Sequence, residues 1–509
     1  MTAKVNLFVN ENLYAFNSGT EHAQARRIRA FQQLGIPAYY VTRNYNRFLA
    51  RDAANLNLDM QTVINMYDYF QGTQTTRMRK QSLHDLADFN WRTDHLDSSN
   101  PNFSLVQKAG RQVARITVLP ATVGLVNEVI YNDRAGNPTR RENWDWRGFL
   151  SSVDRFTPDG QVQVTQYLNL AGDPVLEVNF MVKDGISQPT IWELKQYHGK
   201  NYRFATEDDL FGFFLNELIR QNDGQVNLWS ERRSVDRAVS QAQGMTGRYA
   251  ILHEMHTVTN TDLPAGTLYA GYQDLFEALT PAFDTIFVPS QRQRADLQSR
   301  YPKQNFKVVP DTVVTLPQHV PARDQRIPGH LLVLGRLSAE KAPELALQLL
   351  ALIRNYLPDV TMEFMGYPSS PDYLAQFKAQ VQTLGLGEQV FISKYGDAKQ
   401  VQTALRRAQV LINPSSHEAF GMQLVEGLAA GLPLITMENR YTPNAVVEDG
   451  INGYRLQTLP FNGAVPKIVQ ILEDAQVWQK MSQASLKKAQ AFDLANFGTV
   501  WQEVLADKV

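Results

Sequence analysis

The feature that most constrains this chain is a regular alternation of apolar and amphipathic segments between residues 330 and 437. Strands are predicted at residues 330–335, 361–366, 390–393, 410–414 and 434–437. Helices are predicted between them at residues 342–356, 371–384, 398–407 and 421–430. Strands that alternate with helices of about 10–15 residues indicate a parallel sheet covered by helices on both faces.

The first part of the chain begins in the same way. Residues 5–9 are interpreted as a buried strand, followed by a polar helix over 21–34 and a second strand over 37–42. Residues 60–70 are predicted to form one more helix. The pattern returns after residue 205, with helices at 208–220 and 233–243 and strands at 225–229, 249–253 and 285–289. Both parts favour a doubly wound α/β fold.

Residues 75–204 have a different sequence pattern. Short alternating runs at 114–118, 125–132, 161–168 and 175–182 are separated by segments rich in Gly, Asp, Asn and Pro. Such spacing is typical of antiparallel hairpins. We therefore expect an antiparallel β-meander inserted into the first α/β half.

These patterns predict two Rossmann-like, doubly wound halves that face a cleft. The predicted boundaries are 1–74 and 205–325 for the N-terminal half, 75–204 for the β-rich insert, 326–485 for the C-terminal half and 486–509 for a terminal helix. Ligands of such sheets bind beyond the carboxyl ends of the strands, so the cleft is the expected active site.

Composition excludes several classes of protein. The chain has 50 Lys and Arg against 51 Asp and Glu, which argues against a dedicated nucleic-acid binder. It has no cysteine, so disulfides, thiolate zinc sites and cysteine nucleophiles are excluded. The opening MTAKVNLFVN lacks the features of a signal peptide, and no apolar run approaches the ~20 residues of a membrane span. We expect a cytoplasmic protein whose membrane contact is at most peripheral, at the inner face.

Glu418 and Glu426 flank a predicted anion site. A strand ends near residue 414, a polar loop carries Glu418, and a helix begins near Gly421. The free N–H groups of Phe420, Gly421 and Met422, together with the helix dipole, favour a diphosphate there. Glu418 would lie at the depth of a sugar, and Glu426 would accept hydrogen bonds from ribose hydroxyls. A helix cap and an ordinary helical glutamate are the alternative interpretation.

Two cations follow the strand at 330–335. Arg336 and Lys341 lie at its carboxyl end, where they can neutralise a leaving diphosphate. Each cation alone would be interpreted as a solvated surface residue. Together with the two glutamates on the same sheet edge, they favour a nucleotide-sugar site.

The N-terminal half contributes a glycine and a histidine. Gly19 lets the backbone approach a phosphate or sugar closely, although an ordinary turn glycine explains it equally well, and the turn lacks the G-x-G-x-x-G spacing. His253 and His256 flank Glu254 at a strand end, where their spacing excludes the zinc motif H-E-x-x-H. His256 can instead touch the 6-hydroxyl of a sugar and stabilise positive charge through its backbone carbonyl. The alternative is a packed histidine.

These residues, together with the later segment EDGINGY at 448–454, resemble the retaining GT-B glycosyltransferases of family four. The resemblance covers both α/β halves. The opening NSGTEHAQ, the β insert, the aromatic segment 64–70 and the segment 439–443 resemble a bacterial subgroup of that family. This subgroup contains teichoic-acid α-glucosyltransferases and the catalytic subunits of accessory-Sec protein O-GlcNAc transferases. The resemblance implies a GT-B fold and a UDP-sugar donor, with no cofactor and no metal.

The resemblance also implies roles for individual residues. The implied catalytic residues are His256, Glu418, Arg336 and Lys341. The implied donor-binding residues are Gly19, Thr20, Glu21, His22, Lys394, Tyr395, Ala419, Phe420, Gly421, Met422 and Glu426. Ala419 replaces the second residue of the commoner E-G-F-G, and the common Gly-His of the uracil-contacting loop is missing at Lys394 and Tyr395.

The subgroup's acceptors are glycerol- or ribitol-phosphate polymers, or Ser and Thr of a secreted adhesin. Its β insert builds a trimer in the polymer-modifying members and docks a catalytically inactive partner in the protein-modifying ones. The resemblance therefore implies a homo-oligomer or a hetero-complex formed through the insert. Glucose and N-acetylglucosamine both remain open as the transferred sugar.

We expect a retaining transfer of a hexose from a UDP-sugar to a hydroxyl of a cell-wall polymer, of the poly(glycerol-phosphate) α-glucosyltransferase type. Transfer of N-acetylglucosamine to Ser or Thr of a surface protein is the alternative. Glu418 and Glu426 lie across a helix start, unlike the facing carboxylates of glycosidases, so neither is assigned as a nucleophile. A non-catalytic partner subunit is a third interpretation, which the intact set of cations and carboxylates disfavours. A sugar phosphorylase would need a pyridoxal-binding lysine, for which no motif is present.

Overall fold

The computed structural model of the chain describes residues 4–119, 122, 124–259, 263, 265–441, 446–457 and 461–506. The chain divides into two compact units. The first consists of Met1–Asn17 and Pro37–Arg248, and the second consists of Ser18–Ile36 and Tyr249–Val509.

The first unit contains parallel strands in the order β14-β1-β2-β3. They are β1 (Val5–Asn10), β2 (Ala38–Thr42), β3 (Val63–Asn65) and β14 (Val226–Ser230), accompanied by helices α2 (Leu49–Asn55), α4 (Glu207–Gln221) and α5 (Asp236–Gln241). The central strands are apolar and buried, and the rings of Phe8 and Trp229 stack with centroids 5.4 Å apart. The strands predicted at 5–9, 37–42 and 225–229 are confirmed.

The prediction of one helix over residues 60–70 is wrong. Met60–Thr62 form a 3-10 turn, β3 follows, and the short helix α3 occupies Met66–Gln71. Asn65 causes the change, because its side-chain oxygen accepts hydrogen bonds from the N–H groups of Tyr67 and Asp68 at 3.0 and 3.1 Å. These bonds cap a new helix in the middle of the predicted one.

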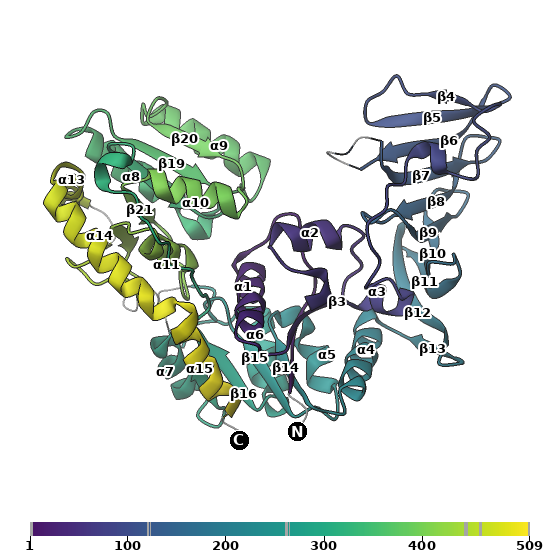
Figure 1. Cartoon of the computed structure of the whole chain (residues 1–509), viewed down its shortest axis with the longest axis horizontal. Coiled ribbons are helices and arrows are strands. Elements are labelled where there is room, and N and C mark those ends of the chain that lie inside the picture. Colours follow the sequence, from purple (N-terminus) through teal and green to yellow (C-terminus); the bar gives the residue numbers. More distant parts are fainter. Residues whose placement is uncertain are drawn as a thin grey trace. The chain divides into compact units, whose positions relative to one another are not determined.

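The insert is an antiparallel meander, as predicted, with its strands in sequence order from β4 to β13 (Figure 1). Its strands are β4 (His95–Asp97), β5 (Phe103–Lys108), β6 (Arg111–Val118), β7 (Val126–Asn132), β8 (Pro138–Trp144), β9 (Leu150–Phe156), β10 (Val162–Leu168), β11 (Pro174–Lys183), β12 (Ile186–Tyr197) and β13 (Lys200–Phe204). Tight turns join them, and Gly160 and Gly172 adopt φ values of +80° and +90° there. Such backbone angles favour glycine, which explains the turn signals in the sequence.

The second unit begins with helix α1 (Gly19–Gln33). Parallel strands β15 (Gly247–Ile251), β16 (Thr285–Val288) and β17 (Phe306–Val308) pair in that order, and helix α7 (Gln291–Arg300) lies between the last two in sequence. Helix α1 packs against the terminal helix α15 (Leu494–Ala506), where the rings of Phe31 and Trp501 meet edge to face at 5.1 Å.

The rest of this unit is a parallel sheet with the order β20-β19-β18-β21-β22-β23. Its strands are β18 (His330–Leu334), β19 (Thr361–Met365), β20 (Val390–Ser393), β21 (Val410–Asn413), β22 (Leu434–Met437) and β23 (Gly453–Leu456). The chain adds β19 and β20 on one side of β18 and then β21 to β23 on the other. The order therefore reverses between β18 and β21, which is where doubly wound sheets bind ligands.

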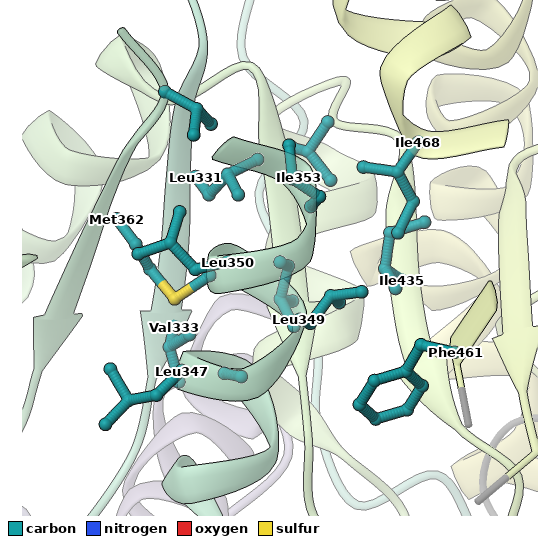
Figure 2. Packing of buried hydrophobic residues seen from close by; sticks show 14 of the residues in the cluster. Leu331, Val333, Leu347, Leu349, Leu350, Ile353, Met362, Ile435, Phe461 and Ile468 are labelled. Carbon is teal, nitrogen blue, oxygen red and sulfur yellow. The ribbon is translucent and has the colours of Figure 1, made fainter. Parts of the chain in front are cut away.

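The helices of this sheet follow the predicted alternation. They are α8 (Pro343–Arg354), α9 (Pro371–Thr383), α10 (Ala398–Arg407), α11 (Met422–Ala429), α13 (Val465–Glu473) and α14 (Ala475–Ala489). Figure 2 shows the main core, in which Leu331 and Met362 of the strands meet Leu350 and Ile353 of α8, and all four are fully buried. Across the described parts of the chain, no helix is both long and apolar enough to traverse a membrane.

Candidate active site

The switch point brings a cation and a carboxylate together. Lys341 ends a 3-10 turn (Ala339–Lys341) after β18, and Glu418 lies in the loop after the neighbouring strand β21. The Nζ atom of Lys341 lies 2.9 Å from Oε2 of Glu418. The same oxygen accepts a hydrogen bond of 3.1 Å from the Nε2 atom of Gln423. Two residues that are distant in sequence thus meet as the strand order requires.

The loop that carries Glu418 is held by local hydrogen bonds. The Oγ atom of Ser415 donates to the carbonyls of His417 at 2.9 Å and Glu340 at 3.3 Å, which ties this loop to the Lys341 turn. Gly421 caps α11 with φ +79°, in the left-handed region that favours glycine. The first N–H groups of α11 have no acceptor within the helix, so its start can bind an anion.

The start of helix α1 lies beside the start of α11. A Cβ atom added at Gly19 would lie 3.7 Å from Cε of Met422, so the starts of α1 and α11 are close together. Further along α1, the guanidinium of Arg26 contacts the carboxylate of Glu426 and donates to Oγ1 of Thr312 at 2.9 Å. The glycine, Met422 and Glu426 predicted for donor binding therefore share one region.

His22 and Tyr395 are also brought together. The Nε2 atom of His22 lies 2.7 Å from the hydroxyl oxygen of Tyr395, whose ring meets that of Tyr367 edge to face at 5.7 Å. Burial and the neighbouring charge of Arg26 lower the pKa of His22 to about 4, so this histidine is neutral at pH 7. Lys394, the other residue of this loop predicted to bind the donor, is exposed.

Thr20 and Glu21 are buried at the start of α1. The Oε2 atom of Glu21 accepts hydrogen bonds from the backbone N–H of Ser18 at 2.8 Å and from its hydroxyl at 2.7 Å. This is a capping box, which fixes the position of Gly19.

The two histidines after β15 have different surroundings. The Nδ1 atom of His253 lies 2.7 Å from Oδ1 of Asp311. His256 is fully buried, and neither of its ring nitrogens has a hydrogen-bond partner among the described residues. Burial lowers the pKa of His256 to about 4. The carbonyl of His256 accepts a bond of 3.2 Å from the N–H of Tyr269.

Arg336 pairs with Glu340, the residue that precedes Lys341. Its side chain is 42% exposed, and its Nη2 atom lies 2.5 Å from Oε1 of Glu340. The guanidinium retains further donors, because this contact uses one of five N–H groups.

The structure adds residues that the sequence analysis missed. Arg26 lies four residues after His22 on the same face of α1, and this spacing was the signal that would have found it. Arg440 and Tyr441 lie in the segment 439–443, and Arg440 binds Asp296 of α7 through both carboxylate oxygens. Thr442 and Pro443 of that segment lie outside the described residues.

This arrangement can bind an anion and a polyol at the same time. The start of α11 and Lys341 offer positive charge, while Glu418 and Glu426 offer acceptors for hydroxyl groups. A search of the described residues finds no group of three or more His, Asp or Glu side chains placed to hold a metal ion.

Sequence comparisons identify relatives of this chain. Residues 326–488 match the family model of the glycosyl transferases group 1. The UDP-N-acetylglucosamine--peptide N-acetylglucosaminyltransferase GtfA subunit of Streptococcus agalactiae is 21% identical over 458 residues, which cover 88% of this chain and 86% of that protein. The poly(glycerol-phosphate) alpha-glucosyltransferase of Bacillus subtilis (strain 168) is 23% identical over 302 residues, which cover 58% of this chain and 43% of that protein.

Two solved structures are similar over nearly the whole chain. The crystal structure of TarM has a TM-score of 0.81 and 16% identity, and the match covers 99% of this chain and 98% of that one. The pneumococcal O-GlcNAc transferase GtfA, solved in complex with UDP and GlcNAc, has a TM-score of 0.82 and 19% identity, with 100% and 99% covered. This likeness shows that the fold is shared.

Proposed function

Because the chain belongs to the group 1 glycosyltransferases and has the GT-B fold, we propose that it transfers a hexose, with retention, from a UDP-sugar to a hydroxyl of a cell-wall polymer. The predicted family and fold are confirmed. The observation that carries the proposal is the meeting of Lys341 and Glu418 at the switch point, beside the start of α11. A helix start next to a lysine suits a diphosphate, and the carboxylate suits the sugar attached to it.

Each residue near this point has a proposed role. Lys341, Arg336 and the first amides of α11 stabilise the departing diphosphate, as preorganised donors do. Glu426 accepts hydrogen bonds from the ribose, and Glu418 binds the hexose. His256, whose buried ring nitrogens have no partner among the described residues, is proposed to bind a sugar hydroxyl. His22 and Tyr395, with their 2.7 Å contact, are proposed to border the nucleotide.

The reaction is proposed to proceed on one face of the sugar. The bond between C1 and the phosphate oxygen breaks, and a bond between C1 and the acceptor oxygen forms on the same side. The acceptor's proton passes to the departing phosphate oxygen, so the protein supplies no nucleophile. The positive charge that develops on the sugar is stabilised by the His256 carbonyl and the Glu418 carboxylate. With cations and amides handling the diphosphate, the transfer requires no metal.

A second acceptor class is supported by the relatives. The Streptococcus agalactiae relative that matches 88% of this chain is named as a peptide N-acetylglucosaminyltransferase subunit. Transfer of N-acetylglucosamine to Ser or Thr of a surface protein is therefore the alternative function. The less favoured alternative, a non-catalytic partner subunit, conflicts with the intact set of Lys341, Glu418 and Glu426.

The assembly and location of the protein are part of the proposal. The crystal structure of a GtfA/B complex, with a TM-score of 0.76 and 18% identity, supports a hetero-complex for this chain. We propose that the β insert, strands β4 to β13, mediates either self-association or such a complex. The proposed site of action is the cytoplasm, at the inner face of the membrane where cell-wall precursors are accessible.

The test is release of UDP from UDP-glucose and UDP-N-acetylglucosamine, measured side by side. The acceptors are a poly(glycerol-phosphate) chain and a Ser/Thr-rich peptide. Lys341→Ala tests the site, and Lys399→Ala, an exposed lysine on α10, is its matched control.

We expect one donor to be preferred, the polymer to accelerate its turnover, and Lys341→Ala alone to abolish the reaction. Acceleration by the peptide alone would replace the polymer with the protein acceptor. No UDP release from either donor, with or without acceptors, would refute a transferase function.

A further inference from the structure

Side chains on one face of helix α7 form hydrogen bonds with two loops of the candidate active site. Gln293 and Asp296 lie three residues apart on this face and are 0% and 6% exposed. The Nε2 atom of Gln293 donates to the carbonyl of Glu254 at 3.0 Å. Asp296 accepts two bonds from Arg440, from Nε at 2.5 Å and from Nη2 at 2.6 Å. The first loop carries His256, and the second, which follows β22, carries Tyr441.

Tyr441 lies between these two loops and the loop of Glu418. Its side chain is 2% exposed and packs in one cluster with Met255, Leu263 and Ala419. Its ring stacks against that of His256, with centroids 6.1 Å apart and planes inclined by 29°. Because Met255 precedes His256 and Ala419 follows Glu418, one tyrosine ring touches both loops that carry proposed sugar contacts.

The ion pair between Asp296 and Arg440, the residue before Tyr441, is stronger than a surface pair. The planar guanidinium of Arg440 meets both oxygens of a carboxylate whose side chain is 8% exposed. Burial would raise the pKa of Asp296, but the bonds from Arg440 and the proximity of the Tyr441 hydroxyl lower that pKa, so the carboxylate stays ionised at neutral pH. An exposed pair would be mobile and worth little.

His256 depends on such packing for its orientation. Neither ring nitrogen is tied to a protein atom in the described part of the chain, so no hydrogen bond fixes the ring. The surrounding side chains, Tyr441 among them, are what restrict it.

We infer that Arg440 and Asp296 are positioning residues that hold Tyr441 against His256 and thereby set the spacing between His256 and Glu418. This inference rests on the proposed function, since it concerns the geometry of sugar transfer. It assigns a role to the segment around residue 440, which the sequence singled out without explaining it.

The test compares kcat and KM for the preferred UDP-sugar in four variants. Arg440→Ala breaks the pair, Asp296→Arg with Arg440→Asp reverses it, His256→Ala removes the positioned ring, and the fourth variant combines Arg440→Ala with His256→Ala. Arg220→Ala, which breaks an exposed pair with Glu217 on α4, is the matched control. Thermal unfolding of each variant reports stability.

We expect Arg440→Ala to lower kcat ten- to a hundredfold while the KM for the donor changes less than threefold. Tm should fall as well, because the buried Asp296 carboxylate loses its partner. The reversed pair should regain at least tenfold in kcat over Arg440→Ala. The combined variant should be no slower than His256→Ala, because both changes act through the same ring. A purely structural role would not produce this lack of additivity.

Three results would overturn the inference alone: a wild-type kcat in Arg440→Ala, effects that add fully with His256→Ala, or no recovery in the reversed pair. If Arg440→Ala fails to fold, Tyr441→Leu replaces it, since it keeps an apolar side chain but removes the ring. An equal kcat in Tyr441→Leu and wild type would then refute the positioning. A wild type that turns over neither donor would instead refute the proposed function and the inference with it.

Discussion

Two acidic side chains of the C-terminal sheet have contrasting surroundings. Glu363 lies within β19, is 1% exposed, and is bound by the side chains of Ser393 and Arg407, with Nε2 of His330 at 3.5 Å. Glu418 lies beyond the end of β21, in a loop next to a helix start, where it meets Lys341. One carboxylate is enclosed by its partners, whereas the other stands where a ligand can reach it.

The position along the strands explains this difference. His330 begins β18, and Lys341 follows its end, so the two clusters use opposite ends of one strand. Burial would raise the pKa of Glu363, yet its bonds from Arg407 and Ser393 and the nearby His330 ring lower that pKa to about 2. We therefore expect the cluster inside the sheet to stabilise the fold and the pair beyond the carboxyl ends of the strands to serve ligand binding.

The largest effect is expected for Glu418→Gln and Lys341→Ala. Each should lower the transfer rate by at least 10²–10³, about 3–4 kcal/mol, because each removes a preorganised charge from the site. Thermal unfolding should shift by less than about 3 °C. Steady-state UDP release and calorimetry check both statements, and wild-type-like turnover in either variant would remove the proposed site.

Glu363→Gln should instead lower stability and leave activity unchanged. At pH 7 it should lower the free energy of unfolding by about 3 kcal/mol and leave kcat per folded molecule unchanged. The pKa of Glu363 is lowered from 4.5 to about 2, so its contribution is complete above pH 4.5 and is lost as the pH falls to 2. Denaturant unfolding at pH 7, 5 and 3 should show the gap between wild type and variant closing. A gap that stays constant would contradict this explanation.

His256 should cause a smaller loss of folding stability as the pH falls. Its pKa is lowered from 6.5 to about 4, so the unfolded chain takes up the proton first as the pH falls. The folded state should lose about 2 kcal/mol between pH 7 and 5 through this group. Because His22 has the same shift, the comparison is between wild type and His256→Asn, and the variant should lose less stability. Equal losses would mean that His256 is not buried in its neutral form.

The smallest effect is expected at the start of α11. Gly421→Ala places a side chain at φ +79° and should cost about 1 kcal/mol of stability. The matched control is Gly212→Ala in α4, where an added Cβ meets no atom within 4 Å and helix propensity should give a gain. Unfolding curves of the two variants should therefore shift in opposite directions, and a shift of the same sign would contradict the assigned backbone strain.

Much of the fold follows from local patterns in the sequence. The alternation after residue 330 and the Gly-rich turns of the insert reflect periodicities of single elements, so both predictions are confirmed. The prediction of one helix at 60–70 is wrong because one side chain, that of Asn65, caps a new helix within this segment. Lys341 and Glu418 were found because a parallel sheet places the carboxyl ends of all its strands at one edge.

Other parts of the site have no local signal. Arg440 and Asp296 are 144 residues apart in sequence, and neither residue type is unusual in its own segment. The stacking of Tyr441 on His256 depends on the same distant pairing. Such contacts arise from the packing of whole elements, which local sequence patterns do not reveal.

A crystal structure with bound UDP tests the central claim most directly. We expect a diphosphate within hydrogen-bond distance of the first amides of α11 and of Lys341, with a ribose hydroxyl at Glu426. UDP bound elsewhere, with Lys341 and Glu418 still paired and untouched, would contradict it.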